Sequence, residues 1–213
     1  MKLPPEEPSF EPWHVVFVGA LLNSWQPQFP AGGSRPGVLA VDGRGASGKS
    51  TLAAQIGRAM SGSVVVHTDD FAWHHAFFDW AELLREGVLK PAHAGQAVHF
   101  RPPAWDARRR EGAIEVPAGC PLLVVEGSGA ARKELMPWID VVVWVQSDLE
   151  RARTRGLVRD GDTAQTRVFW DEWMAEEIPF FARERSWERA NTIVCGMPEL
   201  DHDPGSEMVI AVT

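Results

Sequence analysis

The chain has 213 residues, of which 45% are hydrophobic and 23% charged, and its formal net charge at pH 7 is −8. This length is enough for one domain with a full hydrophobic core, and the composition is typical of a globular protein. The acidic balance argues against nucleic acid as a partner, because nucleic-acid-binding surfaces usually need a basic face. No apolar run approaches the roughly 20 residues of a membrane-spanning helix, so we expect no membrane association.

The first 36 residues are predicted to form an N-terminal extension. Prolines and acids dominate residues 1–12, as in disordered segments. Residues 13–25 are apolar enough for a short helix, and the prolines and glycines of residues 26–36 indicate a connector. The start of the chain lacks the basic, apolar and small-residue regions of a signal peptide, so we expect a cytoplasmic protein.

A glycine-rich stretch organises the rest of the chain. It follows the apolar run 38–41, which reads as a buried strand, and precedes residues 52–60, whose apolar positions recur at helical spacing. Strand, glycine-rich turn and helix are the context in which G-x-x-x-x-G-K-[ST] predicts a phosphate-binding P-loop. Its backbone N–H groups would hold the phosphates, while Lys49 reaches the β- and γ-phosphates and the Ser50 hydroxyl binds Mg²⁺. The expected nucleotide-binding residues are Gly43, Arg44, Gly45, Ala46, Ser47, Gly48, Lys49, Ser50 and Thr51.

The same stretch also spells G-x-G-x-x-G, with Asp69 at the end of the next apolar run. This is the pattern of a dinucleotide-binding Rossmann unit, in which the acid binds a ribose hydroxyl. Lys49 and Ser50 argue against an NAD(P)-dependent oxidoreductase, because a Rossmann turn needs neither side chain, whereas a triphosphate with magnesium needs both.

A second buried strand is predicted over residues 64–67, and it ends at Asp69 and Asp70. Functional residues of a parallel sheet lie at the carboxyl ends of its strands. Both acids are therefore expected at the active-site edge, although a solvated turn or a helix cap is an alternative. The following segment, 72–112, is long for a simple connection and rich in aromatic residues, so we expect it to hold the phosphoryl acceptor.

Two further strands follow. The first is predicted over residues 121–127 and carries Glu126 near its end. The Glu126 carboxylate would assist magnesium binding or polarise the acceptor, and a helix N-cap is the alternative role. Residues 139–145 form the next strand. Cys120 and Cys195 lie in or beside apolar runs, which favours buried reduced thiols over a disulfide or a metal site. The histidine spacings match no metal-ligand pattern.

Four arginines occupy nine residues after the fourth core strand. Arg151, Arg155 and Arg159 are four residues apart and share one face of a predicted helix. Such a row can bind phosphates and neutralise charge during phosphoryl transfer, so residues 148–163 are interpreted as a mobile lid, with Arg155 and Arg159 as catalytic arginines and Arg151 as a nucleotide-binding residue. A solvated helix face is the alternative.

The remaining residues predict one or two amphipathic helices over 164–190 and a fifth strand over 191–195. The core domain is thus assigned to residues 37–200, and 201–213 is a tail or an edge strand. Strands that alternate with helices indicate an α/β fold with a parallel sheet and helices on both faces.

These residues resemble the uridine kinase and phosphoribulokinase-like P-loop kinases. The resemblance spans about residues 37–195. It rests on the P-loop and the arginine lid together with Thr68-Asp69-Asp70-Phe71, Phe78-Asp79, Trp105-Asp106 and Val125-Glu126-Gly127. It implies a three-layer fold with a five-stranded parallel sheet in the order 2-3-1-4-5. It also implies ATP and Mg²⁺ as cofactors, Asp69 as general base on an acceptor hydroxyl, and Asp79 as a ligand of sugar hydroxyls.

The chain departs from uridine kinases at the base-reading positions. Trp105 and Arg110 stand where those enzymes have a tyrosine and a histidine. Trp105 could still stack on a ring, while Arg110 favours an acidic or phosphorylated acceptor. Asp70, Phe71 and Glu126 complete the expected acceptor site.

The sequence therefore predicts transfer of the γ-phosphate of ATP to a hydroxyl of a small, nucleoside-like or sugar-like molecule. A non-catalytic nucleotide-binding or regulatory protein is the alternative. The sequence leaves open the acceptor, the choice between ATP and GTP, the choice between Asp69 and Asp70 as base, and the oligomeric state (monomer or homodimer).

Overall fold

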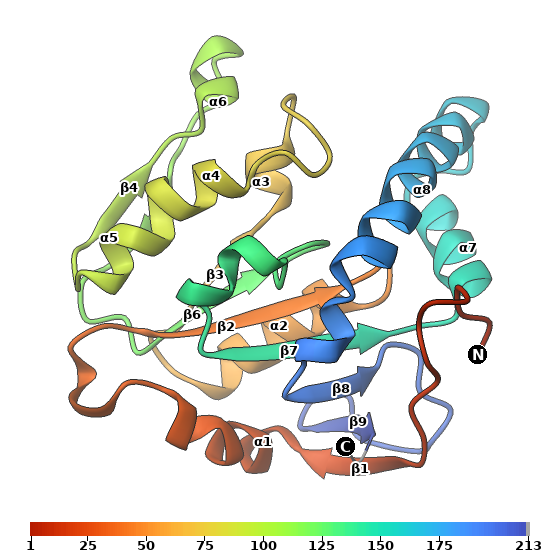
Figure 1. The fold of residues 1–213 in the computed structure, drawn as a ribbon, viewed down its shortest axis with the longest axis horizontal. Helices are drawn as coiled ribbons and strands as arrows, with labels where there is room; N and C mark the ends of the chain where they lie inside the picture. Colours follow the sequence, from red (N-terminus) through yellow and green to blue (C-terminus); the bar gives the residue numbers. More distant parts are fainter. Residues whose placement is uncertain (212–213) are drawn as a thin grey trace.

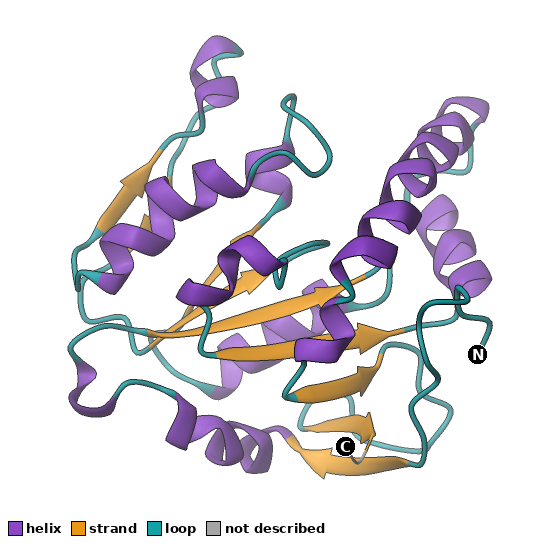
Figure 2. Cartoon of the chain, viewed as in Figure 1, coloured by secondary structure: helices purple, strands orange, loops and turns teal. Residues whose placement is uncertain are grey.

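A computed structural model describes residues 1–211, and a seven-stranded sheet runs through its centre (Figures 1 and 2). The strand order is β1-β9-β8-β7-β2-β6-β3. The strands are β1 (Trp13–Phe17), β2 (Gly37–Gly43), β3 (Val64–His67), β6 (Leu122–Glu126), β7 (Val141–Gln146), β8 (Thr192–Cys195) and β9 (Glu207–Ala211). A separate two-stranded antiparallel sheet pairs β4 (Val98–Phe100) with β5 (Ile114–Val116).

Five of the central strands are parallel and confirm the expected order. Numbered along the chain, β3, β6, β2, β7 and β8 read 2-3-1-4-5. The register places Val41 and His67 on either side of Glu126, while Gly43 lies opposite Val145. The carboxyl ends of these strands therefore meet at one edge of the sheet, where the predicted functional residues follow them.

The sheet has two strands beyond the five parallel ones: β9, in the segment expected to be a tail or an edge strand, runs antiparallel to β8, and β1 runs antiparallel to β9. Residues 13–17 form β1 rather than the start of a helix, and helix α1 (Val18–Trp25) begins only afterwards. β1 pairs along its whole length with β9, so the C-terminal segment lies inside the sheet and β1 is the edge. The β-branched pair Val15 and Val16 suits a strand once a partner is present. That partner is almost 200 residues away in the sequence, which local pattern does not reveal.

Helices cover both faces of the sheet, which makes three layers. β2 alternates between them: Val38 and Ala40 face one core, Leu39 and Val41 the other. α1 and α2 (Lys49–Ala59) pack on the second core, and the helices of the 72–112 segment pack on the first. The shorter helical elements are η1 (Gln26–Gln28), η2 (Ala31–Gly33), α3 (Asp69–Ala72), α4 (Ala81–Leu84), η3 (Arg85–Leu89), α5 (Lys90–His93), α6 (Pro103–Ala107), η4 (Lys133–Trp138) and η5 (Ser186–Arg189).

Two long helices stand at the carboxyl edge of the sheet. α7 (Leu149–Arg159) carries the arginines, and α8 (Ala164–Glu184) returns beside it (Figure 1). α7 begins at an Asp148 cap, and α8 begins at a capping box formed by Thr163 and Thr166. The α7–α8 hairpin thus contains the lid predicted over residues 148–163. No helix within residues 1–211 is both long and apolar enough to cross a membrane.

Residues 1–12 contain no helix or strand, but they lie against the domain instead of forming the disordered lead-in that their composition suggested. The Glu7 side chain is buried and accepts hydrogen bonds from Arg44 Nε (3.0 Å), Trp144 Nε1 (2.9 Å) and Gln146 Nε2 (3.1 Å). Composition predicted solvation here because it could not anticipate these three buried donors.

Candidate active site

The P-loop joins the carboxyl end of β2 to the first turn of α2. Gly43 and Gly48 adopt φ values of 155° and 110°, conformations that favour glycine, and Ala46 also has a positive φ. Asp42 anchors the loop from beneath: its buried carboxylate accepts the backbone N–H groups of Gly43 (2.7 Å), Gly129 (2.7 Å) and Ala131 (3.0 Å). Desolvation raises the pKa of Asp42 despite these bonds. The turns after β2 and β6 are thereby held together.

Lys49 lies within the loop as a phosphate-binding lysine should. Its Nζ donates to the Arg44 carbonyl oxygen (2.7 Å) and to Ser128 Oγ (3.3 Å), and the side chain is buried. The backbone N–H groups of the first turn of α2 have no intrahelical acceptor, and the helix dipole makes this end positive. The arrangement therefore offers backbone amides and one cation to an anion.

Ser50 and Glu126 meet beside Lys49. Ser50 Oγ donates to Glu126 Oε1 (3.2 Å), and the other oxygen of Glu126 lies 2.6 Å from His67 Nδ1. Desolvation tends to raise the pKa of Glu126, but the hydrogen bond with His67 and the charge of Lys49 outweigh it, so this pKa is lowered. The same contact raises the pKa of His67.

This oxygen pair fits a magnesium ion. Magnesium in nucleotide sites is commonly held by one or two carboxylates together with waters and phosphates, so Ser50 and Glu126 supply suitable donors. Within residues 1–211 no group of three or more His, Cys, Asp or Glu side chains is arranged as a metal cage. An ion at this site would therefore depend on the bound phosphates for part of its coordination.

Asp69 follows β3 and lies near Lys49 and Glu126. Its side chain is exposed, yet the surrounding atoms desolvate the carboxyl enough to raise its pKa, and the charge of Glu126 adds to this effect. Lys49 and His67 act in the opposite direction. Asp69 is therefore a carboxylate with a raised pKa at the mouth of a phosphate-binding loop, which suits a general base.

Asp70 is engaged differently from its neighbour. Its Oδ1 accepts from Arg110 Nη2 (2.6 Å), and its carbonyl oxygen accepts from Trp105 Nε1 (2.9 Å). The Arg110 guanidinium lies 3.6 Å from the centroid of the Trp105 ring. Asp70 thus holds the segment after β3 against α6, while Asp69 keeps its carboxylate free of any side-chain hydrogen bond found within residues 1–211.

Two predicted acceptor contacts differ in the structure. Phe71 is fully buried between Phe100 and Trp80, so it is a core residue rather than an acceptor-binding one. Trp105 is buried as well, and Arg110 occupies one face of its ring, so the expected ring stacking is not available in this arrangement. Both aromatic side chains lie in the hydrophobic core formed by the long segment, although their positions in the sequence motifs predicted contacts with the acceptor. Asp79 remains exposed near the start of that segment.

The lid arginines separate into three environments. Arg155 donates through Nε (2.8 Å) and Nη2 to the carbonyl oxygen of Ala46, which places it on the P-loop. Arg159 pairs with Asp160, and the charge of Asp69 contributes to its raised pKa. Arg151 instead pairs with the exposed Glu199 (2.9 Å).

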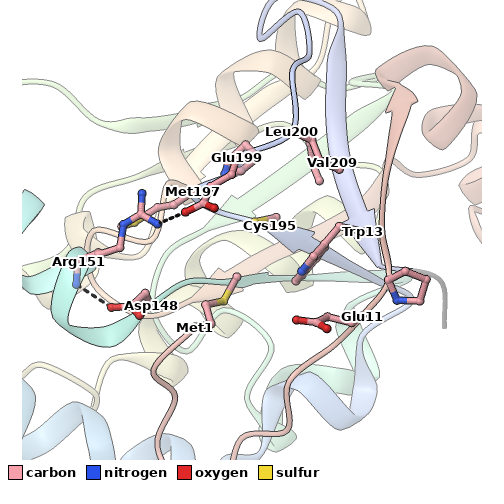
Figure 3. Close-up of a pocket in the computed structure, with 12 residues that line it drawn as sticks. Met1, Glu11, Trp13, Asp148, Arg151, Cys195, Met197, Glu199, Leu200 and Val209 are labelled. Carbon is pink, nitrogen blue, oxygen red and sulfur yellow. Dashed lines mark hydrogen bonds and ion pairs between the residues drawn. The ribbon is translucent and has the colours of Figure 1, made fainter.

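Arg151 borders a cavity of about 520 Å³ between the N-terminal segment and the loop after β8 (Figure 3). Met1, Trp13, Met197 and Leu200 give it an apolar wall. A smaller cavity of about 140 Å³ shares Cys195 and Pro198 with it and reaches Gly48, Thr51 and Gly196. An apolar surface therefore adjoins the helix end of the P-loop.

Three residues of the site were missed from the sequence: Ser128, Trp173 and Glu177. Glu177 is buried and accepts from the N–H of Gly45 (2.6 Å) and from Trp173 Nε1 (3.0 Å). Ser128 Oγ lies 3.3 Å from the same oxygen and shares its single hydrogen between Glu177 and the Gly43 carbonyl oxygen (3.0 Å). Ser128 lies two residues after Glu126 and could have been considered as part of the same strand end. Nothing in the sequence of α8 connects Glu177 to a loop more than 130 residues away.

No family model matches the sequence, and no curated protein matches it. Solved structures do resemble it. A "putative fructose transport system kinase" from Silicibacter sp. TM1040 superposes with a TM-score of 0.58 and 19% identity, over 82% of this chain and 95% of that one. A "possible uridine kinase" from Bacillus stearothermophilus gives a TM-score of 0.54 and 17% identity, over 83% and 96%.

The chain therefore has the fold of the uridine kinase-like P-loop kinases. The strand order excludes the dinucleotide-binding alternative, because β6 separates β2 from β3 here, whereas the Rossmann order places the first two strands side by side.

Proposed function

We propose that the protein is an ATP-dependent phosphotransferase that moves the γ-phosphate to a hydroxyl group of a small molecule. The observation that carries the proposal is the position of Asp69, a carboxylate with a raised pKa beside Lys49 and the Ser50–Glu126 pair at the end of the P-loop. A loop that only bound nucleotide would need no base at this point.

In the proposed reaction Asp69 accepts the proton of the acceptor hydroxyl while that oxygen bonds to the γ-phosphorus. The bond between the γ-phosphorus and the bridging oxygen breaks, and ADP leaves with the electron pair. Lys49 and the loop amides hold the phosphates, and Arg155 closes over the loop and excludes water. Magnesium, held by Ser50 and Glu126, would neutralise phosphate charge.

The cavity beside Gly48 and Thr51, which shares lining residues with the larger one, supports a place for the nucleoside of the donor. A nucleoside there would lie against Gly196 and Pro198, and its phosphates would run along the loop toward Gly45. The acceptor would approach from the side of Asp69, between α3 and the exposed Asp79. Because Asp70 already neutralises Arg110, a neutral hydroxyl compound is the acceptor that these contacts favour.

The first experiment measures ADP release with ATP and Mg²⁺ against a panel of nucleosides, sugars, sugar phosphates and amino alcohols. Asp69→Asn is expected to lower turnover of any active acceptor by about 10²- to 10⁴-fold, as loss of a general base does, with the Kd for ATP changed less than about threefold. Asp201→Asn, at an exposed loop position, is the matched control and should behave as wild type.

An equal loss of ATP binding in Asp69→Asn would contradict its assignment as base. Tight ATP binding without turnover on any compound would instead favour a nucleotide-binding regulator.

A further inference from the structure

Glu177 occupies a position that the proposed reaction does not explain. Its carboxylate is buried beneath α8, and one oxygen accepts from Gly45 and Trp173 and lies 3.3 Å from Ser128 Oγ. Burying a carboxylate is costly unless charged or hydrogen-bonding partners compensate for it. Apolar side chains would pack α8 on the core without this desolvation cost. We therefore look for a role of the carboxylate in its contact with the P-loop.

The partner on the loop is the kind of group that binds phosphate. A P-loop binds anions through its backbone N–H groups, and Gly45 lies in this loop with its N–H directed to Glu177. Its hydrogen bond to Glu177 is only 2.6 Å long, as expected for a charge-assisted contact. An anionic side chain of the protein therefore already occupies one anion-binding amide.

The position of Gly45 in the loop indicates which phosphate of a bound nucleotide would lie nearest to Glu177. The smaller cavity, of about 140 Å³, adjoins Gly48 and Thr51 at the helix end of the loop and shares lining residues with the larger one. Gly45 lies at the opposite end, and Ser128 bridges Glu177 to Lys49, which reaches the β- and γ-phosphates. A phosphate chain that runs from the cavity along the loop brings its last phosphate closest to Glu177.

The charged groups that face Glu177 are Lys49 and Arg44. Arg44 is already paired with Glu7, and Lys49 must also serve the bound phosphates. Desolvation raises the pKa of Glu177, and these two cations act against that rise. A third phosphate would therefore share Lys49 with a carboxylate that cannot move into solvent without displacing α8.

We propose that Glu177 is a specificity-determining residue whose negative charge sets how strongly the P-loop prefers a nucleoside diphosphate to a triphosphate. This inference rests on the proposed function only in requiring that the loop binds nucleotide. Because Glu177 belongs to α8, a terminal phosphate would act on the same helix hairpin that carries the lid arginines.

The test is calorimetric titration of ADP and of a non-hydrolysable ATP analogue, both with Mg²⁺ and without acceptor. Glu177→Gln keeps the volume and an acceptor oxygen but removes the charge. It is expected to tighten the triphosphate analogue about tenfold while ADP changes less than about twofold, because the repulsion falls mainly on the outer phosphate. Glu176→Gln, exposed on the same helix, is the matched control and should leave both affinities unchanged.

Equal changes in both affinities, or a weaker triphosphate complex in Glu177→Gln, would overturn the proposal and leave Glu177 as a structural contact. Glu177→Met provides a second neutral side chain of similar length if the first variant does not fold, and the same selective tightening is expected. If the wild-type protein binds neither nucleotide, the proposed function itself fails; if it binds both and neither variant alters their ratio, only the role of Glu177 fails.

Discussion

The chemistry of Asp69 depends on the charges around it more than on its own identity. Desolvation and Glu126 raise its pKa, whereas Lys49 and His67 lower it. Asp70, the adjacent and chemically identical side chain, also raises the pKa of Asp69 through its charge, but its own carboxylate is paired with Arg110. Two neighbouring aspartates thus differ in environment, because one lies beside Lys49 and Glu126 and the other is paired with Arg110.

The raised pKa gives a pH prediction at the residue scale. A general base must be deprotonated, so kcat/KM should fall as the pH drops through the pKa of Asp69, and this acid limb should lie above the ordinary aspartate value. Glu126→Gln removes a negative charge that raises this pKa, so the limb should move to lower pH. The measurement is a pH–rate profile of both proteins at saturating magnesium.

Asp106→Asn alters an exposed carboxylate that pairs with Arg101 and is not among the charges that shift the pKa of Asp69, so it should leave the limb in place. A limb that stays unchanged in Glu126→Gln would mean that another group is the base.

At the scale of elements, the α7–α8 hairpin depends on one small residue. A Cβ at Gly156 would lie 2.0 Å from Cζ2 of Trp170, and the same ring approaches the Cβ position of Gly45 to 3.3 Å. Trp170 also donates through Nε1 to Asp160 (3.0 Å). The tryptophan therefore packs the lid helices together and holds them near the P-loop.

Gly156→Ala should have two opposite effects on stability, a gain from helix propensity and a loss from packing. Alanine favours the helix by about 1 kcal/mol, but forcing a methyl group into the Trp170 ring costs about 1–3 kcal/mol. We expect packing to dominate and the Tm to fall by about 2–6 °C in a chain of this size. Thermal unfolding followed by circular dichroism measures the change.

Gly57→Ala in α2 is the matched control, because the atoms nearest to its added Cβ lie at 3.4 and 3.7 Å, ordinary contact distances. It should leave the Tm unchanged or raise it. A higher Tm for Gly156→Ala would show that the hairpin repacks freely.

At the scale of the whole molecule, segments from both ends of the chain complete the domain. β1 and β9 extend the parallel sheet on one side, and the N-terminal segment reaches the P-loop through Glu7. Arg44, the partner of Glu7, is buried and also lies over the Phe181 ring at 5.3 Å. The first ten residues are therefore part of the environment of the nucleotide-binding loop.

Glu7→Ala would leave the buried guanidinium of Arg44 without this partner. Removing one member of a buried ion pair typically costs about 3–5 kcal/mol, so we expect a loss of that order in the free energy of unfolding and weaker nucleotide binding. Chemical denaturation and calorimetric titration measure the two effects. Glu6→Ala, one residue earlier and exposed, is expected to change the free energy of unfolding by less than about 0.5 kcal/mol. Equal stability of the two variants would contradict a role for Glu7 in the fold.

The sequence by itself determined the parallel core and pointed to the residues of the candidate site. Apolar runs of strand length, each followed by glycine or acid, are local signals, and they predicted β2, β3, β6, β7 and β8 with Lys49, Ser50, Asp69 and Glu126 near their ends. The order of the strands was predicted from the resemblance to known kinases, and it therefore relies on the tertiary structures of other proteins. These strands, and the residues near their ends, could be predicted because each depends on a short stretch of chain and on one edge of the sheet.

Only the tertiary structure decided the remainder. The antiparallel pair β1–β9, the burial of Phe71 and Trp105, the contact of Arg151 with Glu199 and the positions of Glu7 and Glu177 all join residues that are distant in the chain. A carboxylate in a polar stretch such as Glu176-Glu177 is predicted to be solvated, because the local sequence does not show which hydrogen-bond donors will surround it in the folded protein. Long-range packing supplies that donor, and with it the function that we infer for Glu177.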